Sequence, residues 1–234
     1  PQTSQEQEHL LRGLMNIRRP REISNKFLKI QDEYLTEINN EKGIVSINDL
    51  EPICDNIYLW QGDITTLKIE TIVNAANSQG LGCFLALHNC IDNQVNSNDG
   101  ISLRLECNEI MKLKNYHLET GEAIITNGHN LPCKYIIHTV GPIIHDGVTE
   151  REEKQLKNCY INSLKLAIEK GIRNIAFPCI STGEFRFPKD KACEIAIDAV
   201  EQFLEQYSEK IDKVVFNVFE DEDYKRYEQY FKNF

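Results

Sequence analysis

Short runs of β-branched and aromatic residues alternate with helical stretches from Asn56 onward, and this alternation constrains the fold more than any other feature. Apolar residues at helical spacing occupy 152–169, which Gly171 closes, and 192–207, behind Pro188. Alternating strands and helices predict a layered α/β/α fold with a mixed, largely parallel central sheet. Six runs have the length and composition of strands: 57–60, 71–73, 122–126, 135–140, 174–178 and 213–219.

The first 50 residues follow a different pattern, with apolar side chains at helical spacing in a mostly polar background. Two such stretches, 10–17 and 27–38, are separated at Pro20, which favours two helices rather than one. We therefore expect a helical N-terminal extension over residues 1–50 and one α/β domain over residues 51–234.

Charge and cysteine usage exclude several classes of protein. The chain has 26 lysines and arginines against 36 aspartates and glutamates, a net charge of −10 that opposes attraction to nucleic-acid phosphates and anionic lipids. No run approaches the ~18 consecutive apolar residues of a membrane span, and the first residues lack the order of a secretory signal. The eight cysteines show no small-scaffold spacing, which favours reduced thiols. We expect a cytoplasmic protein with no nucleic-acid and no membrane partner.

Three loops of unusual composition follow predicted strands, where ligands bind in sheets of this kind. They are GDIT at 62–65, NAANSQGLG at 74–82 and STGEFRFP at 181–188. Glycines and small residues let backbone N–H groups approach a ligand, and the hydroxyls of the third loop suit an anion. Each loop taken alone is also compatible with a plain turn or helix cap.

Together GDIT, IVNAAN and ISTGEFRFP, in this order and each after a strand, resemble the macrodomain family of ADP-ribose-binding modules. The resemblance covers about residues 57–220, includes HTVGP at 138–142, and implies a three-layer α/β/α macrodomain. It also implies the ligand contacts. Adenine is expected at Asp63 with the backbone of Ile64, the distal ribose at Asn77 and Phe185, and the diphosphate in the loop of Ser181, Thr182, Gly183 and Glu184.

The loop after IVNAAN contains an insertion, Cys83-x4-His88-x-Cys90. Two thiolates and an imidazole within eight residues can converge on a tetrahedral zinc ion and leave a fourth position open. Chance placement of two buried cysteines and a histidine is the alternative.

The insertion, written GCF-x4-H-x-CIDN, is similar to the zinc-containing branch of macrodomains associated with microbial sirtuin-type ADP-ribosyltransferases. This resemblance implies that Cys83, His88 and Cys90 bind Zn²⁺. It also implies that Asp92 lies at the scissile bond, flanked by Ile91 and Asn93 in the ADP-ribose site.

The expected function is therefore zinc-dependent removal of mono-ADP-ribose from acidic side chains of modified proteins, with Asn77 and Asp92 as catalytic residues. The alternative is a reader module that binds ADP-ribose without turnover. A single-stranded nucleic-acid module is disfavoured by the acidic charge and the lack of interleaved basic and aromatic residues. His138, within a predicted strand, is expected to be a core or rim histidine.

Overall fold

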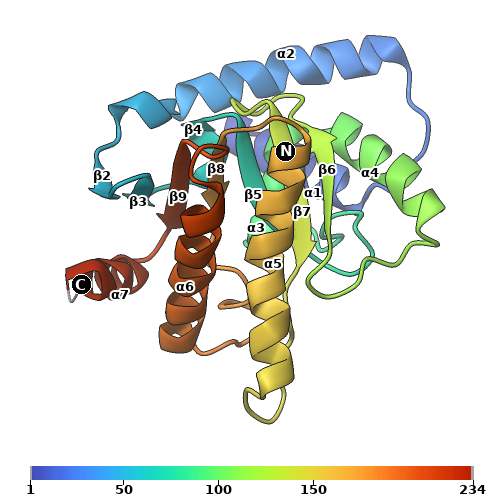
Figure 1. Cartoon of the computed structure of the whole chain (residues 1–234). Coiled ribbons are helices and arrows are strands. Elements are labelled where there is room, and N and C mark those ends of the chain that lie inside the picture. The colour runs from blue at the N-terminus through green and yellow to red at the C-terminus, as the bar shows by residue number, and fades with distance from the viewer. Residues whose placement is uncertain (1, 233–234) are drawn as a thin grey trace.

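The computed structural model describes residues 2–232 and places a seven-stranded sheet at the centre of the protein (Figure 1). The strand order is β2-β3-β9-β8-β5-β7-β6, with the five inner strands parallel and the edge strands β2 and β6 antiparallel to their neighbours. The predicted mixed, largely parallel sheet is confirmed. Its strands are β2 (Pro52–Cys54), β3 (Ile57–Gln61), β5 (Thr71–Ala76), β6 (Ala123–Asn127), β7 (Tyr135–Val140), β8 (Asn174–Phe177) and β9 (Lys213–Val218). A separate pair joins β1 (Val45–Ser46) to β4 (Leu67–Lys68), and the 3-10 helices are Ile47–Asp49 and Ile64–Thr66.

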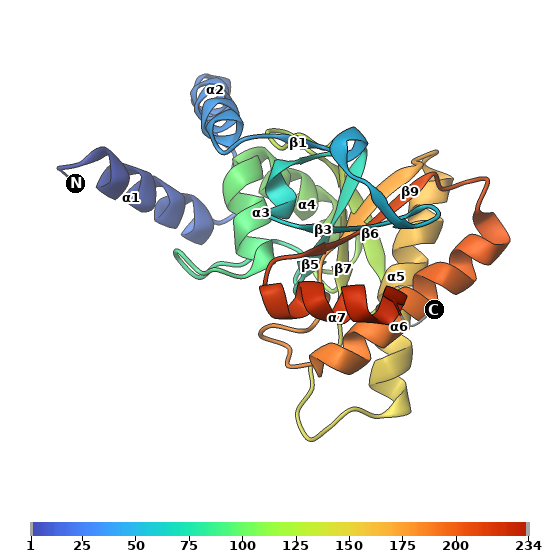
Figure 2. The same ribbon diagram turned by 90° about the vertical axis from the view of Figure 1, so that its left-hand side faces the viewer.

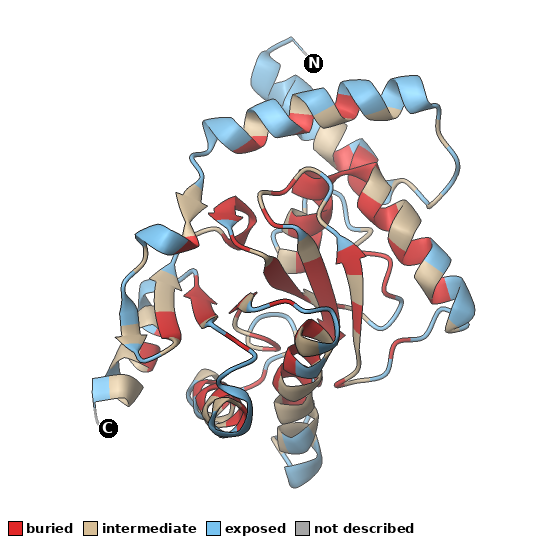
Figure 3. Cartoon of the chain, turned by 45° about the horizontal axis from the view of Figure 1, so that its top comes forward, coloured by how far each residue is buried: buried red, intermediate tan, exposed pale blue. Residues whose placement is uncertain are grey.

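Helices cover both faces of the sheet, as Figure 2 shows. The helices α3 (Ile91–Asp99) and α4 (Ile101–Leu113) pack on one face, and α5 (Glu150–Glu169) and α6 (Lys189–Tyr207) on the other. The C-terminal helix α7 (Asp221–Lys232) packs beside α6 and β3. Successive residues of β5 enter different cores: Ile72 packs with Val95 of α3, and Val73 packs with Leu156 of α5. The sheet is therefore buried on both faces (Figure 3).

The two expected N-terminal helices are present as α1 (Ser4–Ile17) and α2 (Asn25–Glu41). They pack over α3 and α4 through a small cluster around Met15, Leu35 and Ile101. Asn39 Nδ2 adds hydrogen bonds of 2.9 Å to the carbonyl oxygens of Asn98 and Asn130. The extension is thus attached to the α/β body by both apolar and polar contacts.

Three helices, α3, α4 and α7, lie outside the predicted elements. The helix α3 is mostly polar and only weakly amphipathic, so apolar periodicity gives little indication of it, whereas α7 is mostly polar but amphipathic. Gly100 separates α3 from α4 at a φ of 93°. A Cβ atom at Gly100 would lie 2.6 Å from Nε2 of Gln31, so glycine also permits the close approach of α2. No helix within residues 2–232 is long and apolar enough to cross a membrane.

Candidate active site

The predicted ligand loops meet at one edge of the sheet. The strands β3, β5 and β8 are parallel, so their carboxyl ends point the same way, and the loops at 62–63, 77–90 and 178–188 follow them directly. One boundary differs from the prediction, because β5 continues to Ala76. Asn74 is therefore a buried strand residue rather than a loop residue, and Asn77 is the first residue beyond the strand.

Asp92 occupies the first turn of α3 and is only 4 % exposed. Its Oδ1 accepts hydrogen bonds from Nδ2 of Asn74 at 2.8 Å and Nδ2 of Asn96 at 3.2 Å, and its Oδ2 accepts from Nδ2 of Asn77 at 3.0 Å. Burial raises the pKa of the Asp92 carboxyl to about 6, against the opposing effects of these amides and of Arg104. The structure thus brings together the two residues predicted to be catalytic, Asn77 and Asp92.

A buried histidine contacts Asn74, one of the amides that bind the Asp92 carboxylate. His138 of β7 lies opposite Asn74 in the sheet, with its Nδ1 3.1 Å from Asn74 Nδ2 and its Nε2 2.9 Å from Thr126 Oγ1. Burial lowers the pKa of His138 to about 4, so the ring is neutral at physiological pH. The expectation of a core histidine is confirmed. Asn74 was not predicted as a site residue, although its place in the NAAN segment was a usable signal.

Cys83, His88 and Cys90 converge in the segment that joins β5 to α3. Their ligand atoms all lie within 4.8 Å of one another, and Cys83 Sγ is 3.7 Å from His88 Nδ1. Ligands ~2.0–2.3 Å from a tetrahedral zinc ion lie roughly 3.5 Å apart, so the spacing and the donor types both fit zinc. Burial raises the pKa of the Cys90 thiol to about 12, so binding of a cation there must displace a proton.

The loop after β8 forms a cradle with an unpaired hydroxyl. Ser181 has a φ of 66°, is 6 % exposed, and its Oγ has no hydrogen-bond partner among residues 2–232. Thr182 Oγ1 donates to the carbonyl oxygen of Cys179 at 3.0 Å, and the Phe187 N–H donates to the Ser181 carbonyl at 2.9 Å. A Cβ atom at Gly183 would meet nothing within 4 Å. An exposed glycine beside a buried, unpaired hydroxyl suits an anion that approaches the backbone.

Asp63 combines a cap with a free acceptor position. Its Oδ1 accepts from the N–H and the Oγ1 of Thr65 at 2.9 and 2.7 Å, and so caps the 3-10 helix Ile64–Thr66. Its Oδ2 takes no part in these bonds. Asp63 can therefore cap this helix through Oδ1 and still contact adenine through Oδ2. The same 3-10 helix packs against α3.

The remaining predicted residues differ in what their side chains contact. Glu184 Oε1 lies 3.6 Å from Nε2 of His88, which joins the 181–188 loop to the Cys/His cluster, and Phe185 and Ile91 are half-buried. Asn93 is fully buried, and its Oδ1 accepts from Arg12 and Asn16 while its Nδ2 donates to the Leu85 carbonyl. The side chain of Asn93 thus holds neighbouring segments together.

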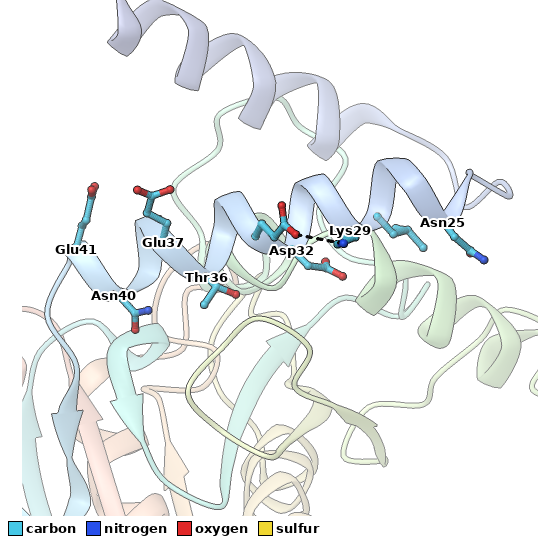
Figure 4. Close-up of a pocket in the computed structure, with 9 residues that line it drawn as sticks. Asn25, Lys29, Asp32, Thr36, Glu37, Asn40 and Glu41 are labelled. Atoms are coloured by element: carbon cyan, nitrogen blue, oxygen red, sulfur yellow. Dashed lines mark ion pairs between the residues drawn. The ribbon is translucent and has the colours of Figure 1, made fainter.

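A shallow cleft that is largely open to solvent lies elsewhere, along α2. Figure 4 shows that Glu37 and Glu41 point to one side of this helix and Thr36 and Asn40 to the other. The cleft is lined only by residues of α2, several of them acidic, and includes none of the predicted ligand residues. We assign the candidate site to the sheet edge because the buried carboxylate and the Cys/His cluster lie there.

Comparisons with known proteins show the family and the fold of the chain. Residues 73–196 match the Macro domain family. A protein-ADP-ribose hydrolase of Treponema medium is 48 % identical over 227 residues, covering 95 % of this chain and 87 % of the relative. A protein-ADP-ribose hydrolase of Staphylococcus aureus strain MRSA252 is 46 % identical over 233 residues, covering 99 % and 87 %. The crystal structure of a Trypanosoma brucei macrodomain in complex with ADP-ribose aligns with a TM-score of 0.73 and 28 % identity, covering 98 % of this chain and 96 % of that one.

Proposed function

The chain belongs to the Macro domain family, and we propose that it is a zinc-dependent hydrolase that removes mono-ADP-ribose from acidic side chains of modified proteins. The hydrolase class is supported by the relatives named protein-ADP-ribose hydrolase, which match nearly the whole chain at 48 % and 46 % identity. We place the chain in the zinc-containing branch associated with sirtuin-type ADP-ribosyltransferases. A cytoplasmic location suits this proposal, because its thiols stay reduced there.

The observation that carries the proposal is the proximity of a buried carboxylate to a zinc-type ligand set. Cys90 is the N-cap of α3, and Asp92 follows it in the first turn. Asn77 Nδ2 donates both to Asp92 and to the carbonyl oxygen of Gly82, the residue that precedes Cys83. The side chains proposed for the reaction and those proposed for the metal therefore share one short, hydrogen-bonded segment.

ADP-ribose is expected to lie across the carboxyl ends of β3, β5 and β8. The adenine amino group would donate to Asp63, and the diphosphate would bind the Ser181–Gly183 backbone and the Ser181 hydroxyl. The distal ribose would then lie at Asn77 and Phe185. Backbone N–H groups supply local positive potential, so the net charge of −10 does not prevent this binding.

Hydrolysis adds water across the bond between the distal ribose and the carboxyl oxygen of the modified side chain, and yields ADP-ribose and the free carboxylic acid. Asn77 would hold the ribose, and Asp92 would orient the water and accept its proton. Zinc bound by Cys83, His88 and Cys90 would supply Lewis-acid polarisation beside that bond.

The deciding experiment is time-resolved release of ADP-ribose from a protein modified on aspartate or glutamate. Wild-type, zinc-loaded protein should release ADP-ribose. The Asp92→Ala variant should be slower by about 10²-fold or more, because it loses a general base, while the exposed Asp49→Ala control should match wild type.

The metal and the reader alternative are tested with the same assay. Cys83→Ala should lower the zinc content and the release rate together, and Cys54→Ala, which changes an exposed thiol of β2, should lower neither. Tight ADP-ribose binding without release by the zinc-loaded wild type would favour the reader. Release unchanged after zinc removal would give the metal a structural role.

A further inference from the structure

The three candidate zinc ligands lie on a segment with little regular structure of its own. Residues 77–90 form no helix or strand, and Leu85 and Leu87 are 62 % and 42 % exposed. Leu87 has a φ of 57°, a left-handed conformation that is unfavourable for leucine. Ligands on such a segment keep a fixed geometry only if surrounding contacts hold them.

These contacts come from α1, which lies far from the loop in sequence. Arg12 Nη2 donates to the carbonyl oxygen of His88 at 2.8 Å and to Oδ1 of Asn93 at 2.9 Å. Asn93 Nδ2 in turn donates to the carbonyl oxygen of Leu85 at 2.8 Å. One guanidinium group therefore binds the backbone of a candidate ligand directly and, through Asn93, the exposed part of the loop.

The position of α1 against the loop is itself fixed. A Cβ atom at Gly13 would lie 3.8 Å from Cβ of Ala86, so the helix backbone lies directly beside the loop. At the C-terminus of α1, directly after this contact, Arg104 Nη1 donates to the carbonyl oxygens of Met15, Asn16 and Arg18 at 2.8, 2.9 and 2.8 Å. A buried cation at a helix C-terminus is stabilising, and Arg104 Nε also donates to the Leu81 carbonyl at 2.8 Å.

We propose that α1 belongs to the metal centre and that Arg12 is a positioning residue, which holds the 83–90 loop in the geometry that binds zinc. The inference rests on the zinc site of the proposed function. Arg12 acts through the His88 backbone and through Asn93. Its Nη2 donates to both acceptors while its Nε donates to Ser97 Oγ at 3.3 Å, so the planar group uses two nitrogens at once, an arrangement that the single nitrogen of lysine does not reproduce.

Zinc affinity is the first test. Competition with a chromogenic chelator should show that Arg12→Ala binds zinc about 10- to 100-fold more weakly than wild type, the usual effect of losing a contact that orients a ligand. The control is Arg21→Ala, an exposed arginine after α1 that makes no hydrogen bond to residues 83–90. ADP, which lacks the distal ribose, should bind both variants as it binds wild type in calorimetry.

Hydrogen exchange of the amides of residues 83–90 in the metal-free protein is the second test. Exchange should be faster in Arg12→Ala than in wild type or Arg21→Ala. Unchanged zinc affinity in Arg12→Ala would overturn the inference and leave the proposed function intact. A wild-type protein that binds no zinc would overturn both the metal part of the proposed function and the metal role of Arg12, whereas unchanged exchange would overturn the positioning itself. If Arg12→Ala does not fold, Arg12→Lys carries the same measurements.

Discussion

Two alanines separate Asn74 from Asn77, and this spacing places two amides around one carboxylate. Side chains alternate along β5, so Asn74 faces α3 as Ile72 does, while Asn77 approaches Asp92 from beyond the strand end. His138 occupies the neighbouring register position in β7 and binds Asn74 from the other side. The carboxylate is therefore oriented by hydrogen-bonded amides, of which Asn74 is fully buried and Asn77 half-buried.

The neutral state of His138 predicts a loss of stability in acid. Its pKa falls from 6.5 to about 4 on folding, so the unfolded chain binds a proton that the folded protein excludes between these values. Stability contributed by His138 is complete above pH 6.5 and is lost as the pH falls toward 4. Denaturant unfolding should show that His138 contributes roughly 2 to 3 kcal/mol less to the free energy of unfolding at pH 4.5 than at pH 8.

The comparison of wild type with His138→Gln isolates that component. Burial raises the pKa values of Asp92 and Asp99 to about 6, and both contribute with the opposite sign over part of the same window, so the difference between proteins is the useful quantity. His138→Gln should be less stable at pH 8 but lose less on acidification. The exposed His117→Gln should behave as wild type, and an equal acid loss in His138→Gln would contradict the prediction.

The 178–188 loop depends on a glycine from another connection. Gly141 follows β7, and a Cβ atom there would lie 1.9 Å from Oγ of Ser181. The Ile144 N–H also donates to the Phe185 carbonyl at 2.8 Å, so the two loops after β7 and β8 form one unit. The loop conformation proposed to hold the diphosphate therefore depends on contacts between the loops after β7 and β8, and not on the 178–188 loop alone.

Substitution Gly141→Ala should displace Ser181 and weaken ADP binding by 10-fold or more. Overpacking of this kind costs about 1–3 kcal/mol of folding stability, which a thermal melt would detect. Gly183→Ala is the matched control for stability, because a Cβ atom there meets open space. It should melt as wild type does. A Gly141→Ala protein with wild-type melting and ADP affinity would contradict the loop geometry.

The N-terminal extension and the α/β body are held together by contacts of several kinds. Leu35 is 5 % exposed against Ile101 at the start of α4, and Gln31 Oε1 accepts the Ile101 N–H at 3.0 Å. The strand β1 pairs with β4 before the expected boundary at residue 50 is reached. Such contacts predict that the extension and the body unfold together.

Leu35→Ala should therefore destabilise the whole chain. Trp60 is the only tryptophan and lies on β3 in the body, so its fluorescence reports unfolding away from α2. Removal of the buried leucine should lower the free energy of unfolding reported by Trp60 fluorescence by about 2–5 kcal/mol. Ile30→Ala, which changes a side chain 58 % exposed, should leave this free energy nearly unchanged. A Trp60 transition that does not move in Leu35→Ala would show that residues 1–50 form an independent unit.

The sequence by itself determined the features that depend on neighbouring residues. Periodicity of two or 3.6 identifies strands and helices locally, so the sheet class, α1, α2, α5 and α6 were predictable. The cluster of Cys83, His88 and Cys90 was also predictable from the sequence, because a short segment can bring its own side chains together. The order of the three loop motifs located the sheet edge that carries the candidate site.

Only the tertiary structure decided which distant groups complete that site. Asn74 meets His138 because two strands share a register, Ser181 meets Gly141 across two loops, and Arg12 meets His88 across 76 residues. Nothing in the local pattern around a single arginine specifies its acceptor, since that choice depends on how α1 packs. The sequence analysis also missed the mostly polar helices α3 and α7, which are stabilised by packing in the folded protein, α3 against β5 and α4, and α7 against β3 and α6.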